Sequence, residues 1–239
     1  MSKRKLLGAI LALAVLGLAV VLWFTLMQGP EPQPVPEPVV EPVVEPVAEV
    51  SPEVAPEVAR TNPILAIDVA GEAAGTIFVQ LRPDLAPEHV ARIMSLAESD
   101  AYDNVVFHRV IDGFMAQTGD VQYGRRGGDT ARAGMGGSDQ PDLGAEFSDA
   151  PFARGVMGMA RSSSPNSANS QFFLMFAPAP HLNGQYTVVG EIVGGCDILD
   201  AVRRGRGPNG AMLDEPDYMS DVRVVLPGDD TLGPMGAPC

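Results

Sequence analysis

The stretch that decides the fold is VVFHRVIDGFMAQTGD, residues Val105–Asp120. Read with a period of two, its first half predicts a strand with Phe107, Arg109 and Ile111 on one face and the intervening residues on the other. The Asp-Gly pair that follows predicts a tight turn. We therefore expect a hairpin that begins with a lone arginine among apolar residues.

The second strand of this hairpin is expected over Phe114–Thr118. The pairing would hold Arg109 close to Phe114, Met115 and Gln117. A cation beside large apolar side chains is costly unless something uses its charge. The hairpin is therefore the first candidate for a functional site.

The flanking sequence predicts more short strands and two helices. Strands are expected over Ile64–Val69, Gly75–Leu81, Gly155–Ala160, Ser170–Phe176, Tyr186–Val193 and Asp221–Leu226. One helix is expected after an Asp84 cap, with Pro87 early in it and Val90, Ile93, Met94 and Ala97 on its apolar face. A second is expected over Cys196–Arg204. This pattern predicts an antiparallel barrel or sandwich.

The N-terminal part, residues 1–28, predicts a membrane anchor. Residues 6–27 are 22 uncharged, almost wholly apolar positions, and about 20 helical residues span a bilayer. Lys3, Arg4 and Lys5 precede them, so the positive-inside rule predicts a cytoplasmic N-terminus and a domain on the far side. A cleaved signal peptide is the alternative, but the apolar run exceeds the ~7–15 residues of a signal core.

Residues 29–60 form a linker of recurring Glu-Pro-Val units that cannot build a core. An extended polyproline-like spacer is expected, and a docking segment for a proline-recognising module is the alternative.

The remaining domain, residues 61–239, holds 12 arginines and 23 carboxylates, a formal charge of −11. This charge argues against nucleic acid as a partner. Cys196 and Cys239 permit one disulfide, but two free thiols are the favoured reading.

Conventional hydrolytic or metal chemistry finds little support. The three histidines, His89, His108 and His181, have no evident catalytic partner, and the Ser162–Ser164 run lacks a nucleophile elbow. The glycine-rich residues 124–139 lack the Gly-Lys-Ser/Thr of a phosphate loop. No metal and no cofactor are expected.

Rotation about a prolyl peptide bond needs neither proton transfer nor a covalent intermediate. Its barrier is the loss of amide resonance, about 18–20 kcal/mol. A guanidinium such as that of Arg109 would stabilise the twisted amide, whose nitrogen becomes a hydrogen-bond acceptor. Phe114, Met115 and Phe173 could bury the proline ring while Gln117 holds the flanking backbone. The same apolar residues could also be ordinary core.

FHRVIDGFMAQTGD closely resembles the cyclophilin signature, and GVMGMARSSSPNSANSQFFLMF and HLNGQYTVVGEIVGGCDILDAV resemble consecutive cyclophilin blocks. The resemblance covers residues 64–226. It implies a mainly β fold, an eight-stranded antiparallel β-barrel capped by two α-helices, and peptidyl-prolyl cis-trans isomerase activity.

The resemblance also implies the roles of individual residues. Arg109, Gln117 and Phe114 are the expected catalytic residues. The expected substrate-binding residues are Met115, Ala160, Arg161, Gln171, Phe173, His181, Leu182 and Tyr186.

Three positions depart from the family pattern. His181 stands where cyclosporin-sensitive members carry tryptophan, so weak cyclosporin binding is expected, and a tight calorimetric titration would contradict this. Tyr186 replaces a histidine of eukaryotic members, as in bacterial-type ones. Arg161 replaces a groove asparagine and is expected to shift peptide preference.

The sequence thus predicts a single-pass inner-membrane isomerase whose catalytic domain lies on the periplasmic side and assists folding of extracytoplasmic proteins. Its partners would be proline-containing polypeptides and the membrane, and a monomer is expected. The alternatives are a non-catalytic proline-peptide receptor or holdase, which would not need Arg109, and a structural envelope protein.

Overall fold

The computed structural model describes residues 62–229, 232 and 234–239. The predicted anchor and linker lie outside these residues. Among the described helices, none is long and apolar enough to cross a membrane.

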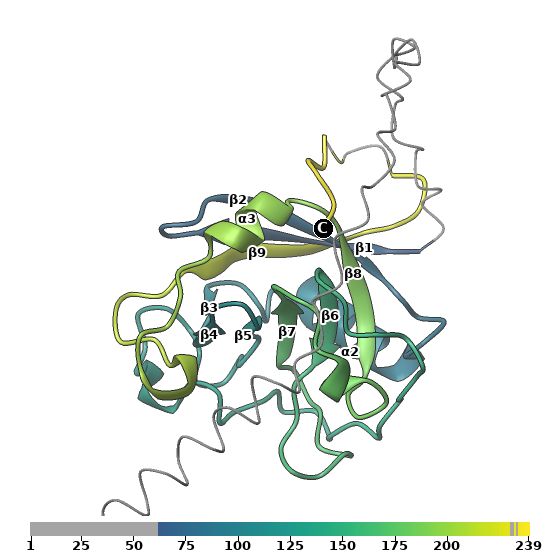
Figure 1. Ribbon diagram of the computed structural model, residues 1–239, viewed down its shortest axis with the longest axis horizontal. Coiled ribbons are helices and arrows are strands. Elements are labelled where there is room, and N and C mark those ends of the chain that lie inside the picture. The colour runs from purple at the N-terminus through teal and green to yellow at the C-terminus, as the bar shows by residue number, and fades with distance from the viewer. Residues whose placement is uncertain (1–61, 230–231, 233) are drawn as a thin grey trace, which may run out of the picture. The chain divides into compact units, whose positions relative to one another are not determined.

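Nine strands form one antiparallel sheet that curls around an apolar core (Figure 1). The strands are β1 (Ile64–Ala70), β2 (Gly75–Leu81), β3 (Val105–Val106), β4 (Arg109–Ile111), β5 (Met115–Thr118), β6 (Val156–Met159), β7 (Phe172–Met175), β8 (Val188–Gly194) and β9 (Tyr218–Val225). Their order in the sheet is β3-β9-β1-β2-β8-β6-β7-β5-β4. Two α-helices, α2 (Pro87–Glu98) and α3 (Cys196–Ala201), and three short 3-10 helices, η1 (Thr130–Arg132), η2 (Pro180–Leu182) and η3 (Pro208–Gly210), complete the described part.

The mainly β architecture with two α-helices is confirmed, but the expectation of an eight-stranded barrel is wrong in its number of strands and in its closure. Nine strands are present, and the ladder has two ends, β3 and β4. These two strands are consecutive in the chain and are separated only by Phe107 and His108. The backbone itself therefore joins the two edges of the curled sheet. The Thr118 hydroxyl, which donates to the carbonyl of Val106 at 2.9 Å, adds a link from β5 to β3.

Because the chain passes from one edge of the sheet to the other here, the single strand expected over residues 105–111 is wrong. Phe107 and Val110 are both fully buried in the main core, although a period of two would put them on opposite faces. The chain leaves one edge of the sheet after Val106 and joins the other at Arg109, so the alternation restarts between them. The turn at Gly113 and the strand that follows it are confirmed.

The first helix lies where the sequence predicts it, but its cap differs. Residue Ala86 stands at the N-cap without a side-chain bond, and Asp84 instead pairs with Arg82 at 2.7 Å. The Glu146 carboxylate accepts the N–H groups of Glu88 and His89 at 3.2 and 3.0 Å. A residue distant in sequence thus satisfies the free donors of the first turn.

The second helix is shorter than expected, because it ends at Ala201 rather than continuing to the two arginines. At its start, Cys196 forms a disulfide with Cys239, so the expectation of two free thiols is wrong. The bond closes a loop over 43 positions and brings the C-terminal segment against β8, where Met235 contacts Gly194. Sequence alone could not show that these two positions meet.

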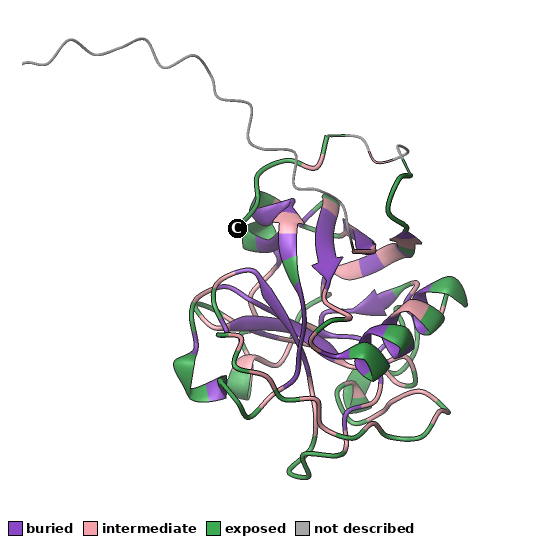
Figure 2. Ribbon diagram, turned by 90° about the vertical axis from the view of Figure 1, so that its right-hand side faces the viewer, coloured by how far each residue is buried: buried purple, intermediate pink, exposed green. Residues whose placement is uncertain are grey.

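Buried residues are concentrated in the strands of the sheet, and exposed residues lie mainly in the loops and on the outer sides of the helices (Figure 2). The main core collects residues of the inner sheet face and of α2, including Leu65, Ile77, Ile93 and Phe172. A second cluster gathers around β5, β6 and β7 and includes Met115, Phe152, Phe173 and Leu182. This second cluster forms the floor of the candidate site.

Candidate active site

A cavity of about 300 Å³ opens beside β4, β5 and β7. Its lining residues are Arg109, Phe114, Met115, Gln117, Ala160, Arg161, Phe173, His181, Leu182 and Tyr186. Strand pairing brings these residues together, since β5 bonds to β4 on one side and to β7 on the other. The 3-10 helix η2 supplies the wall with His181 and Leu182.

The floor of the cavity is apolar and aromatic. Met115 and Phe173 are 2% and 5% exposed, and the ring of Phe152 stacks on Phe173 with centroids 5.7 Å apart. Tyr186 meets the same phenylalanine edge to face at 5.9 Å. Such rings pack closely and resist repacking. The floor therefore fits a small, rigid apolar group.

The Arg109 guanidinium forms the polar side of the cavity. Its Nη1 donates to Oε1 of Gln117 at 3.0 Å, its Nε to the backbone carbonyl of Asn209 at 3.0 Å, and its Nη2 to Oδ1 of Asn209 at 3.0 Å. None of these partners is a carboxylate. Three bonds fix the plane of the guanidinium without neutralising its charge.

Burial lowers the pKa of Arg109 below its ordinary value. An arginine remains protonated at neutral pH, so the effect of burial is to strengthen the interaction of its charge with a polar group in the cavity. A guanidinium in this position suits stabilisation of an acceptor that appears only in a transition state.

A chain of amides extends from the arginine. The Nε2 of Gln117 donates to Oε1 of Gln171 at 3.0 Å, and Nε2 of Gln171 donates to the carbonyl of Gly136 at 2.7 Å. The backbone N–H of Ala160 donates to the carbonyl of Gln171 at 2.9 Å. The network ties the orientation of Arg109 to the loop that carries Gly136.

The structure brings together almost all residues that the sequence nominates. Ten of the eleven predicted site residues line the cavity, and Gln171 lines the adjoining hollow. This adjoining hollow, of about 530 Å³, shares Gln117, Ala160 and Arg161 with the cavity. The placement is observed, whereas the role of each residue stays a prediction.

Sequence reasoning missed Asn209, although it makes two of the three described bonds to Arg109. The residue has φ +54°, in the left-handed region that asparagine tolerates better than most residues. The Pro-Asn-Gly sequence at 208–210 signals a turn. It does not reveal that the turn faces a residue 100 positions earlier.

His108 lies beside the site but turns away from the cavity. Burial lowers its pKa from 6.5 to about 4, and this outweighs the nearby Asp120, which raises it. The ring is therefore neutral at pH 7. Asp120 is itself fully buried and accepts the N–H groups of Gln122, Tyr123, Gly134 and Gly136, so it holds the turn that follows β5.

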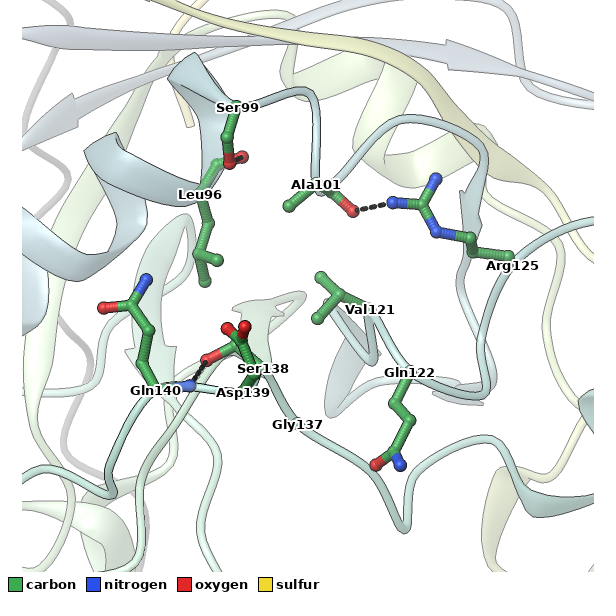
Figure 3. A pocket seen from close by; sticks show the side chains of 10 residues that line it. All are labelled: Leu96, Ser99, Ala101, Val121, Gln122, Arg125, Gly137, Ser138, Asp139 and Gln140. Atoms are coloured by element: carbon green, nitrogen blue, oxygen red, sulfur yellow. Dashed lines mark hydrogen bonds between the residues drawn. The ribbon is translucent and has the colours of Figure 1, made fainter.

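A further hollow of about 420 Å³ lies between the end of α2 and the loop at Gly137–Gln140 (Figure 3). Its one lining arginine, Arg125, is bound to the backbone carbonyls of Asp103 and Ala101 at 2.9 Å. The carbonyls hold this guanidinium against the wall, as Figure 3 shows for Ala101. The arrangement offers no catalytic pair comparable with that of Arg109 and Gln117.

Metal chemistry also finds no support in the described part of the chain. No group of three histidine, cysteine, aspartate or glutamate side chains could hold an ion there. What the cavity offers is an apolar floor, two fixed guanidinium groups at Arg109 and Arg161, and a set of amides. A reaction without proton transfer fits this set.

Comparison with known proteins agrees with the geometry. The family model "Cyclophilin type peptidyl-prolyl cis-trans isomerase/CLD" matches residues 65–224. The chain belongs to this family. It is accordingly an isomerase, and the nine-stranded curled sheet with two α-helices is its version of the cyclophilin fold.

Relatives carry the same description. A probable peptidyl-prolyl cis-trans isomerase of Brucella suis biovar 1 is 57% identical over 157 residues, 65% of this chain and 79% of that protein. The Arabidopsis thaliana isomerase CYP18-1 is 36% identical over 142 residues, 59% of this chain and 85% of that protein. The family model covers residues 65–224, which is the part of the chain that contains the cavity.

Solved structures match the fold. A Cryptosporidium parvum cyclophilin type isomerase, studied in the presence of the dipeptide Ala-Pro, has a TM-score of 0.57 at 24% identity and covers 68% of this chain and 98% of its own. The cyclophilin AquaCyp293 of Hirschia baltica has a TM-score of 0.55 at 24% identity, covering 72% of this chain and 75% of its own. These likenesses support the architecture alone.

Proposed function

We propose that the domain isomerises prolyl bonds of polypeptides by stabilising the twisted amide with Arg109. The observation that carries this proposal is the guanidinium held by Gln117 and Asn209 at the side of an apolar cavity. In the twisted amide the nitrogen lone pair localises and accepts a hydrogen bond, whereas in the planar amide it does not. The fixed cation therefore favours the transition state over both ground states.

The apolar floor is proposed to hold the proline ring. Met115 and Phe173 are buried in the apolar cluster below the cavity, and Leu182 and Phe114 line the cavity with them. The Ala-Pro dipeptide used with the Cryptosporidium parvum relative supports proline-containing peptides as substrates. Gln117 and Gln171 are proposed to bind the backbone on either side of the rotating bond, so that one side stays fixed while the other turns.

The clients are proposed to be extracytoplasmic proteins. The apolar run of residues 6–27 and the basic residues before it support a membrane anchor with the domain on the far side. The disulfide between Cys196 and Cys239 supports an oxidising compartment. The Glu-Pro-Val linker would give the domain reach from the membrane.

The test is NMR exchange on an Ala-Pro peptide with the full chain purified in detergent. We expect exchange cross-peaks between cis and trans signals with the wild type. Arg109→Ala should lower the exchange rate by about 10²-fold or more, as removal of one transition-state donor does in other enzymes. Arg126→Gln, which removes an exposed arginine paired with Glu215, is the matched control and should leave exchange unchanged.

The same spectra separate the competing functions. Peptide signals that shift on binding without accelerated exchange would identify a proline-peptide receptor and overturn the isomerase mechanism. Exchange that survives Arg109→Ala at the wild-type rate would leave the activity standing and remove Arg109 from it.

A further inference from the structure

The charge of the cavity is opposite to that of the domain around it. Residues 61–239 have a formal charge of −11, yet the cavity lining contains two arginines, Arg109 and Arg161, and no aspartate or glutamate. Many other arginines of the domain pair with carboxylates, as Arg154 does with Asp200 and Arg223 with Asp68, although Arg125 is bound to backbone carbonyls. Within the described residues, neither cavity arginine has such an ion pair.

Arg161 is held in place by groups that leave its charge uncompensated. Its Nη1 donates to the carbonyl of Ser162 and its Nη2 to the carbonyl of Gln185, both at 2.9 Å. The guanidinium also lies over the ring of Tyr186, 4.4 Å from the centroid. Its Nε has no partner among the described residues. A fixed guanidinium binds a carboxylate at a smaller entropic cost than a mobile one.

Arg161 lies where a bound polypeptide must pass. It lines both the proline cavity and the adjoining hollow, so a chain that runs from one to the other crosses it. The hollow contains one acid, Asp142, which accepts a hydrogen bond from Nδ2 of Asn169 at 3.0 Å. Near the proline itself, the substrate therefore meets two positive charges and no negative one.

We propose that Arg161 makes the site select prolyl bonds with an acidic residue one or two positions from the proline. This selection rests on the proposed function, because the proline must bind in the cavity for its neighbour to reach Arg161. A carboxylate there would gain a charge-assisted hydrogen bond in a partly desolvated site, which is stronger than the same pair on an open surface. A lysine would meet like charge and be disfavoured.

The test compares five-residue peptides that carry Glu, Gln or Lys one position before, two positions before, or one position after the proline. Exchange rates give kcat/KM with the full chain at low salt. At one of these positions we expect Glu to exceed Gln by about five- to tenfold, as a good ion pair does. Lys should fall below Gln, and the ratio of Glu to Gln should shrink in 1 M NaCl.

Variants of Arg161 test whether the preference for Glu depends on this residue. Arg161→Gln should bring the ratio of Glu to Gln close to one, and Arg161→Lys, which keeps the charge without the planar fork, should retain part of it. Arg126→Gln should retain all of it. Because the readout is a ratio between two peptides on the same preparation, partial unfolding of a variant does not change it.

A ratio near one at all three positions with the wild type would overturn the proposal, and so would an unchanged ratio in Arg161→Gln. If no peptide shows accelerated exchange, the isomerase mechanism fails instead. In that case, the shifts of the peptide signals still give dissociation constants for the Glu and Gln peptides. The ratio of these two constants, in the wild type and in Arg161→Gln, then supports or overturns the role of Arg161 in binding.

Discussion

At the scale of single residues, the proposed mechanism depends on how firmly Arg109 is held. The sequence identifies the arginine and Gln117 through a contiguous motif, so this half of its environment is predictable. The other half comes from Asn209, which a loop near the end of the chain delivers. A contact across 100 positions follows from the closed sheet and not from any local pattern.

We expect Asn209→Gly to lower kcat/KM by about three- to tenfold with little effect on KM. Glycine adopts the φ of +54° without strain, so the change removes only the Oδ1 bond to Nη2 and keeps the backbone bond to Nε. One hydrogen bond contributes about 1 kcal/mol, which corresponds to this range. NMR exchange at several peptide concentrations separates the two constants. Wild-type kcat in the variant would show that the other bonds suffice.

The neutral His108 makes the stability of the domain depend on pH. Its pKa is about 4 when folded and near 6.5 when unfolded, so between these values the unfolded state binds more protons. The free energy of unfolding should therefore fall as the pH drops from 7 to 5, by up to about 1.4 kcal/mol per pH unit from this group. Urea unfolding at pH 7, 6 and 5 measures the slope.

His108→Gln is the control, because it removes the titrating ring and leaves the carboxylates that also respond to acid. The variant should show a shallower loss of stability over the same range. Equal slopes in both proteins would mean that the pKa of His108 is the same in the folded and unfolded states.

At the scale of elements, local patterns locate the strands and helices, while their ends depend on the whole fold. Asp84 has the spacing of a helix cap, yet it pairs with Arg82, and Glu146 takes the capping position from 57 residues away. The strand expected over residues 105–111 is interrupted at Phe107, because its first part pairs at one edge of the sheet as β3 and its last part pairs at the other edge as β4. Neither outcome has a signal in a short window of sequence.

Glu146→Ala should destabilise the domain by about 2–3 kcal/mol. It leaves the N–H groups of Glu88 and His89 without partners, together with Nδ1 of His89, whose side chain is fully buried. Urea unfolding at pH 7 gives the difference. Asp84→Ala is the matched control at the position that sequence rules select, and it should cost less than about 1 kcal/mol because its ion pair is exposed. The reverse order of the two variants would contradict this assignment.

At the scale of the whole molecule, the disulfide ties the C-terminal segment to the start of α3. Reducing it should lower the free energy of unfolding by about 2–4 kcal/mol, because the cross-link restricts the unfolded chain. Urea unfolding with and without reductant measures the effect, and mass analysis after alkylation verifies that both thiols are free.

A variant with serine at both Cys196 and Cys239 should have the same free energy of unfolding as the reduced wild type, and adding reductant should not change it. If reduction left the wild-type transition in place, the disulfide would hold the tail without contributing to the global fold. The sequence could not decide whether these two cysteines pair, since two cysteines so far apart in the chain show only that a disulfide is permitted.

Both ends of the described sheet are covered. Strand β3 forms a bridge with Arg125, and its Val106 N–H donates to the carbonyl of Gly124. Strand β4 forms a bridge with Ala211, and its Val110 carbonyl accepts from the N–H of Gly205. An uncovered edge would offer a row of free N–H and C=O groups to which any extended chain could add itself as a strand. Under the proposed function, the domain meets incompletely folded polypeptides that could add such a strand. Covered edges would let it bind a client in the cavity and release it without becoming the seed of an aggregate.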